Sequence, residues 1–139
     1  FMRFPNIAAY IEQTKEFAKE KGYTETLFGR KRYLPDIHSF TPQIRAAAER
    51  SAVNFPIQGA AADIIKMAMV NVSQECVSDR CRMLLQIHDE LLFEVADDIV
   101  KESAAKIKQI MEEVVQLSVP LVVQVKAGCN WQQLSPLSL

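Results

Sequence analysis

Glycine, proline and cysteine are scarce in this chain, long hydrophobic runs are missing, and each shortage excludes a class of protein. Only 4 glycines and 6 prolines occur in 139 residues and 49% of the residues are hydrophobic, so the chain is globular and not disordered. No apolar run approaches the roughly 20 residues that are needed to span a bilayer. Cys76, Cys81 and Cys129 are odd in number and lack metal-ligand spacing, which indicates reduced thiols in a reducing compartment.

Strong net charge and a signal peptide are also missing. The formal charge is −1, but residues 1–50 carry +3 and residues 51–139 carry −4. This asymmetry fits a protein that grips a polyanion in its first part and binds cations in its second, although charged faces are often merely solvated. Because the first residues resemble neither a signal peptide nor a natural start, we expect a fragment.

The most informative stretch is residues 84–95, where two apolar runs flank a charged tripeptide. Burial of an unpaired carboxylate costs several kcal/mol, so His88, Asp89 and Glu90 are poor core material. The pattern predicts a β-hairpin with these three residues at its bend. The alternate apolar residues of both arms share one parity and are expected to bury one face: Leu85, Ile87, Leu91, Phe93 and Val95.

The predicted bend holds two adjacent carboxylates, Asp89 and Glu90, on a rigid support, which is what a divalent metal site needs. Acids are common in turns, and an Asp-Glu pair on its own is more often only solvated. A buried hairpin with a charged tip nevertheless points that tip into a cleft or at a ligand. Which explanation holds depends on what else faces the same cleft.

The first forty residues predict a helix followed by a small basic hairpin. Apolar residues at helical spacing indicate an amphipathic helix over 5–21, which Gly22 ends. Two short β-prone arms around Gly29 predict a hairpin over 23–34. Its turn projects three cations into solvent, either as a solubility patch or as a phosphate contact: Arg30, Lys31 and Arg32.

Long helices and one further strand are expected in the remainder of the chain. Pro42 at a first helical position predicts a helix that kinks or breaks near Phe55, because Pro56 removes a backbone donor. A further helix is expected from residues 97–98, a half-exposed strand over 121–126 and a frayed tail over 135–139. The predicted class is therefore α+β, with antiparallel strands and long helices on one face.

Three hydrogen-bond donors, Arg50, Asn54 and Gln58, lie at i, i+4 and i+8 on the predicted helix. On a regular helix this spacing aligns them on one face along about 12 Å. The DNA minor groove presents acceptors on every base pair, so such a row can hold any correctly paired duplex. By spacing alone, an ordinary polar helix face is the commoner explanation. Beside an acidic hairpin tip, the row suits two-metal phosphoryl transfer.

At these positions the chain closely resembles the C-terminal polymerase region of family A DNA polymerases, the DNA polymerase I family. The resemblance lies in RSAVNFPIQGAAADIIK at 50–66 and QIHDEL at 86–91. GYTETLFGRKRYLPD at 22–36 is similar to the fingers hairpin of that family, and GCNW at 128–131 to its closing segment. The motifs occur in the family's order and cover nearly the whole chain.

The resemblance implies a role for each motif. Residues 1–40 would be part of the fingers, and residues 41–139 the palm side with its antiparallel sheet and catalytic hairpin. Asp89 would be a ligand of two catalytic Mg²⁺ ions, and Glu90 would support the same site. Asp63 and Lys66, at i and i+3, are expected to form a local ion pair. Primer–template DNA would be bound by His88, Arg50, Asn54, Gln58, Arg30, Lys31 and Arg45.

The resemblance also implies partners and limits. The partners would be primer–template DNA, a dNTP and the remainder of the polymerase domain, and no membrane is expected among them. The compartment would be a bacterial cytoplasm or nucleoid, or a nucleus or organelle. The family's second metal-binding aspartate and its nucleotide-binding helix are expected outside these residues, so the isolated chain is expected to be inactive. The alternatives are a non-catalytic duplex-DNA-binding module and a metal-dependent phosphodiesterase that also uses Asp97 and Asp98.

Overall fold

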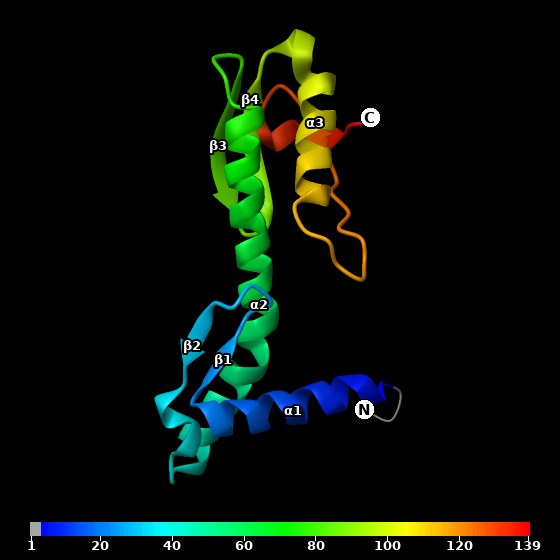
Figure 1. Cartoon of the computed structure of the whole chain (residues 1–139). Helices are drawn as coiled ribbons and strands as arrows, with labels where there is room; N and C mark the ends of the chain where they lie inside the picture. The colour runs from blue at the N-terminus through cyan, green and yellow to red at the C-terminus, as the bar shows by residue number, and fades with distance from the viewer. Residues whose placement is uncertain (1–3) are drawn as a thin grey trace. The chain divides into compact units, whose positions relative to one another are not determined.

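The computed structural model describes residues 4–139, and the chain divides into two compact units, Phe1–Asp63 and Ile64–Leu139 (Figure 1). Within the described residues, helices combine with three two-stranded antiparallel sheets, which confirms the predicted α+β class. Helix α2 (Pro42–Glu75) contributes residues to both units. No helix among residues 4–139 has the length and hydropathy of a membrane-spanning segment.

Unit 1 begins with α1 (Pro5–Lys21), whose bounds match the predicted helix. Gly22 ends the helix with φ 74°, a left-handed backbone conformation that glycine adopts without steric cost, and its N–H donates to the Ala18 carbonyl at 2.9 Å. Ala18 is fully buried, whereas Ile7 of the same predicted stripe is 50% exposed. The apolar stripe of α1 is therefore buried mainly toward its C-terminal end.

Strands β1 (Tyr23–Glu25) and β2 (Lys31–Tyr33) form the predicted basic hairpin, and Gly29 with φ 78° allows the turn between them. The short 3-10 helix η1 (Pro35–His38) leads from the hairpin to α2. The core of this unit lies where α1, η1 and α2 meet, and its buried residues are Ala18, Leu34, Ile37, Ala48 and Ala52.

Helix α2 begins at Pro42, as predicted, and continues without interruption through Pro56. Of the kink or break predicted near Phe55, the break is therefore absent. A proline inside a helix costs about 3 kcal/mol and a glycine about 1 kcal/mol, so contacts from outside the helix offset an unfavourable local sequence here. The β1–β2 hairpin supplies one of them, because the Arg30 guanidinium lies 5.1 Å from the centroid of the Phe55 ring.

Unit 2 contains the second predicted hairpin, formed by β3 (Cys81–Ile87) and β4 (Glu90–Val95), and helix α3 (Val100–Glu113). One turn of 3-10 helix, η2 (Asp97–Ile99), precedes α3 at the predicted helix start. The hairpin and the helices share one core. Its buried residues are Val72, Cys81 and Ile107, with Cys76, Met83, Phe93, Val95, Ile110 and Met111 packed against them.

A β-bulge between Met83 and Leu85 changes which residues of β3 share a face with Phe93. Met83 pairs with Phe93, but Leu85 pairs with Leu92, so β3 holds one extra residue between these two pairs. The extra residue moves Leu85 and Ile87 to the face opposite Phe93, and Leu85 is 49% exposed. The predicted common face is therefore wrong for Leu85 and Ile87.

The C-terminal segment differs from its prediction in two ways. Residues 121–125 alternate between half-buried and exposed as expected, but they form no strand. The Val123 N–H donates to the Glu112 carboxylate of α3 at 2.8 Å and not to a neighbouring strand. Only β5 (Lys126–Ala127) is a strand, and it pairs with β6 (Ser135–Pro136). The first residues of the predicted frayed tail are thus held in a sheet.

Candidate functional site

The predicted row of donors lies on one uninterrupted helix. Arg50, Asn54 and Gln58 are all exposed, while Ala48 and Ala52 of the same helix are buried in the core of unit 1. Because α2 continues through Pro56, the i, i+4, i+8 spacing aligns the three donors on one face along about 12 Å. The structure therefore brings together the three helix residues that the sequence predicted.

Arg45 and the hairpin cations make contacts within the chain that the sequence did not predict. Arg45 donates from Nη1 to the Ser39 carbonyl at 3.0 Å, which ties one of its donors to the backbone. Lys31 is exposed, and its Nζ lies 4.3 Å from the centroid of the Tyr23 ring. Arg32 also lies over an aromatic ring, that of Phe55, at 5.7 Å. The three hairpin cations are thus exposed, as predicted, and each also lies over an aromatic ring.

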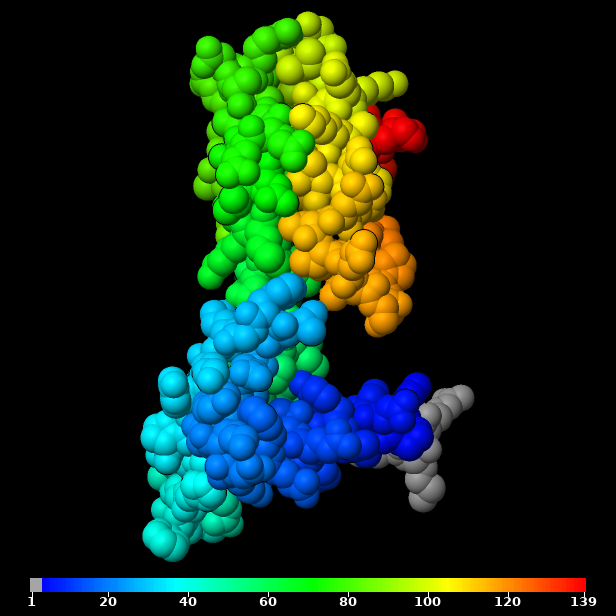
Figure 2. Space-filling view, in the orientation of Figure 1, coloured from blue at the N-terminus to red at the C-terminus, as the bar shows by residue number. Residues whose placement is uncertain are grey.

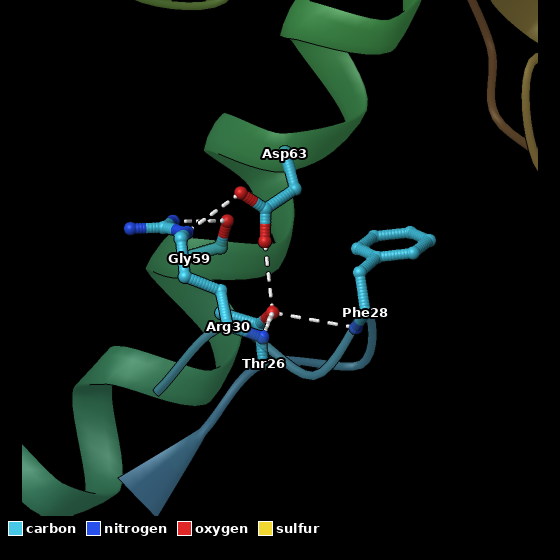
Figure 3. Close-up of polar contacts among 5 residues, drawn as sticks. All are labelled: Thr26, Phe28, Arg30, Gly59 and Asp63. Atoms are coloured by element: carbon cyan, nitrogen blue, oxygen red, sulfur yellow. Dashed lines mark hydrogen bonds and ion pairs between the residues drawn. The ribbon is translucent and has the colours of Figure 1, made fainter. Parts of the chain in front are cut away.

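Arg30 is the most strongly held of these cations (Figure 3). Its Nε donates to Asp63 Oδ1 at 2.8 Å and its Nη2 donates to the Gly59 carbonyl at 3.0 Å. Asp63 therefore pairs with Arg30 and not with Lys66, so the predicted i, i+3 ion pair is wrong. The reason is burial: the Asp63 side chain is only 14% exposed, and a shielded carboxylate needs a close cation and further donors.

Thr26 and Gly59 complete this contact, and sequence reasoning missed both. Thr26 is 4% exposed, and its hydroxyl donates to Asp63 Oδ2 at 2.8 Å while it accepts the N–H groups of Phe28 and Arg30, each at 3.3 Å. A Cβ at Gly59 would lie 2.5 Å from Thr26 Cγ2, so only glycine permits this close approach. The hairpin lies directly against α2, as Figure 2 also shows.

The acidic tip lies at the end of the β3–β4 hairpin. Ile87 pairs with Glu90, so the turn consists of His88 and Asp89, and Glu90 is the first residue of β4. His88 has φ 54°, and its carbonyl accepts a hydrogen bond from Gln86 Nε2 at 2.9 Å. All three tip residues are exposed, which leaves both carboxylates accessible to a ligand.

The donor set at this tip fits part of a magnesium site. Carboxylate oxygens are ligands that Mg²⁺ prefers, and the ion commonly binds through one or two carboxylates together with water and substrate phosphates. Residues 4–139 contain no group of three or more potential metal ligands. Asp89 and Glu90 could therefore hold Mg²⁺ only together with oxygen ligands from elsewhere.

The additional acids of the phosphodiesterase alternative, Asp97 and Asp98, lie in the turn before α3. Asp98 forms an ion pair with Arg80, and this guanidinium holds the pKa of the Asp98 carboxyl below its ordinary value. Asp97 lies beside it in η2, the turn that precedes α3. An ion-paired carboxylate at a helix start has a structural partner already, so these residues give that alternative no support.

Three comparisons relate the chain to known proteins. A model described as DNA polymerase family A matches residues 1–133. The DNA polymerase I of Pseudomonas aeruginosa is 48% identical over 136 residues, or 96% of this chain, and that of Deinococcus radiodurans is 50% identical over 131 residues, or 94%. The chain spans 15% and 14% of the lengths of these two relatives.

A solved structure is similar over most of the fold. It is described as the POL domain of Pol1 from M. smegmatis in complex with DNA primer-template and dNTP. The match has a TM-score of 0.82 and 48% sequence identity, and it covers 87% of this chain and 22% of that one.

Proposed function

The chain belongs to DNA polymerase family A, and on that premise we propose that it takes part in DNA-templated addition of nucleotides to a primer 3′-hydroxyl. The observation that carries the proposal is the exposed His88–Asp89–Glu90 turn at the end of a rigid hairpin in a member of this family. The activity is that of the complete protein that contains these residues. Its relatives from bacteria support the bacterial cytoplasm as the compartment.

The acidic turn would supply ligands to the reaction centre. Asp89 would bind the catalytic Mg²⁺ directly, Glu90 would support the same site, and a further carboxylate from outside this chain would complete it. The chemistry that two bound Mg²⁺ ions supply is a lowered pKa of the primer 3′-hydroxyl and neutralisation of charge on the leaving pyrophosphate. The exposed His88 would contact the primer end.

The exposed face of α2 would hold the duplex. Arg50, Asn54 and Gln58 present donors at a regular spacing, and the minor groove offers acceptors on every correctly formed base pair. Such contacts check the shape of a duplex without reading its sequence. The similar M. smegmatis domain, whose structure is a complex with DNA primer-template and dNTP, supports this assignment.

The decisive experiment is Asp89→Asn in the complete protein. We expect primer extension to be abolished while affinity for primer–template DNA stays close to that of the wild type, because the change removes a metal ligand and no duplex contact. Glu94→Gln is the matched control, since Glu94 is an exposed acid on strand β4, which follows the turn, and should retain extension. Wild-type turnover in Asp89→Asn would contradict the proposal.

Two further variants test separately whether the donor row of α2 binds the duplex. Arg50→Ala and Gln58→Ala should each weaken primer–template binding by about 1–3 kcal/mol, measured as the dissociation constant at fixed salt. Gln13→Ala, at an exposed position of α1, is the control. Undiminished affinity in both variants would contradict the assignment of the row.

The isolated 139-residue chain is expected to be inactive. The second metal-binding aspartate and the nucleotide-binding helix of the family are expected outside these residues. Nucleotide incorporation by the purified chain with Mg²⁺ and primed template would contradict this expectation. Duplex binding by the complete protein with no extension under any condition would instead favour the non-catalytic module.

A further inference from the structure

The stretch of α2 that carries part of the donor row is its least helix-prone part. Pro56 cannot donate a backbone hydrogen bond, and Gly59 has more conformational freedom to lose than any other residue. Asn54 precedes this stretch and Gln58 lies within it. The alignment of these two donors therefore depends on helical structure that the local sequence does not favour.

Arg30 contacts this stretch over its whole length. Its guanidinium lies 5.1 Å from the Phe55 ring centroid, donates to the Gly59 carbonyl at 3.0 Å and donates to Asp63 at 2.8 Å. One side chain from the hairpin thus joins residues 55, 59 and 63, which lie on successive turns of one helix face. Figure 3 shows its contacts with Gly59 and Asp63.

The contacts of Arg30 engage its Nε and Nη2 groups, while its side chain is 45% exposed. Asp63 is 14% exposed and also accepts the hydroxyl of Thr26, which is itself buried. The guanidinium is therefore matched to a carboxylate, a carbonyl and an aromatic face at once. An arginine that binds a phosphate, in contrast, presents a free planar fork of N–H donors to two phosphate oxygens.

We propose that Arg30 is a positioning residue, which acts through α2 by keeping residues 55–59 helical and thereby keeping Asn54 and Gln58 in line for the duplex. Asp63 and Thr26 hold Arg30 in place for this task. The proposal rests on the proposed function in one respect, the duplex grip of the donor row. It replaces the expectation that Arg30 contacts a template phosphate.

Salt-dependent binding distinguishes these two roles. In the complete protein, we would measure primer–template dissociation constants over a range of salt for Arg30→Ala, Asp63→Asn and the double variant. A positioning role predicts that both single variants weaken binding by a similar factor, about 3- to 10-fold, because each removes one half of a single contact. The double variant should be no weaker than either, and the salt slope should stay that of the wild type.

A phosphate contact predicts a different pattern. Arg30→Ala would then lower the salt slope by about 1, while Asp63→Asn would free the guanidinium and leave binding equal or tighter. That pattern would overturn the proposal. Lys15→Ala is the control for loss of an ion pair elsewhere in unit 1, because Lys15 pairs with Glu12 on α1 at 3.0 Å and should not affect binding.

Hydrogen exchange tests the proposal independently of DNA. Exchange of the backbone amides of residues 57–60 in the complete protein should be several-fold faster in both Arg30→Ala and Asp63→Asn, and unchanged in Lys15→Ala. Unchanged exchange in both variants overturns the positioning role whatever the binding result. A third outcome separates the two proposals. If Arg50→Ala leaves DNA affinity unchanged while these amides exchange faster in Arg30→Ala and Asp63→Asn, the donor row does not bind the duplex, but Arg30 still positions the helix.

Discussion

Replacement of Gly59 by alanine should destabilise the contact between the β1–β2 hairpin and α2, although alanine is the better helix former. In an open helix interior the change would stabilise the protein by about 0.8–1 kcal/mol. Here the new Cβ would lie 2.5 Å from Thr26 Cγ2 and 3.2 Å from Arg30 Nη2. The flexible arginine can give way by a few tenths of an ångström at little cost. The buried threonine can move only at the expense of its own contacts.

The size of the effect follows from what Thr26 would lose. To make room, it would have to move away from Asp63, to which its hydroxyl donates at 2.8 Å. A hydrogen bond to a charged partner contributes about 1.5–3 kcal/mol, which exceeds the gain in helix propensity. We therefore expect a net destabilisation of about 1–2 kcal/mol, localised at the hairpin.

Native-state hydrogen exchange measures this change where it occurs. The amides of Phe28 and Arg30 both donate to the Thr26 hydroxyl at 3.3 Å, so they report the opening of this contact. In Gly59→Ala they should exchange about 5- to 30-fold faster, since 1.4 kcal/mol corresponds to a factor of about ten. The double variant Gly59→Ala/Thr26→Ser removes the clashing methyl group, keeps the hydroxyl, and should restore slow exchange. Slower exchange in Gly59→Ala, or no rescue by serine, would refute the reasoning.

Two further predictions concern unit 2. The Lys108 ammonium and the Val123 N–H hold the pKa of Glu112 below its ordinary value, so the stabilisation of residues 121–125 by this carboxylate is complete above about pH 4.3 and is lost as the pH falls through the lowered value. The Val123 amide resonance should follow that titration and should not titrate in Glu112→Gln. Burial raises the pKa of the Cys81 thiol, so a maleimide should label the exposed Cys129 before Cys81. Peptide mapping of the labelled protein checks the order. Earlier labelling of Cys81 would contradict its burial.

The parts of the fold that the sequence predicted well depend on local signals. Gly22 ends α1 because a left-handed residue closes the helix, and Pro42 begins α2 because its missing donor is harmless there. The acidic hairpin was also found, since a charged tripeptide between apolar arms has few other solutions. In each case the deciding interaction lies within a few residues of the signal.

The predictions that were wrong depend on distant partners or ambiguous patterns. The rule that a proline breaks a helix failed at Pro56, because contacts from a hairpin far away in the sequence offset its cost. The rule that residues at i and i+3 pair failed at Asp63 for the same reason. The bulge in β3 has no local marker, because Leu84 and Leu85 fit either face of a strand equally well.

Local strain accompanies both candidate groups in this chain. At the acidic tip, His88 adopts φ 54°, a conformation that costs a residue with a Cβ about 1 kcal/mol. In the donor row, Pro56 weakens the helix between Asn54 and Gln58, and Gly59 weakens it directly after Gln58. Neither departure improves the stability of its own local segment. Strained positions persist where the surrounding contacts fix them, as the Arg30 contact does for α2 and the β3–β4 pairing does for the tip. Two places where the chain departs from ideal local structure are therefore places where its proposed chemistry requires a defined geometry.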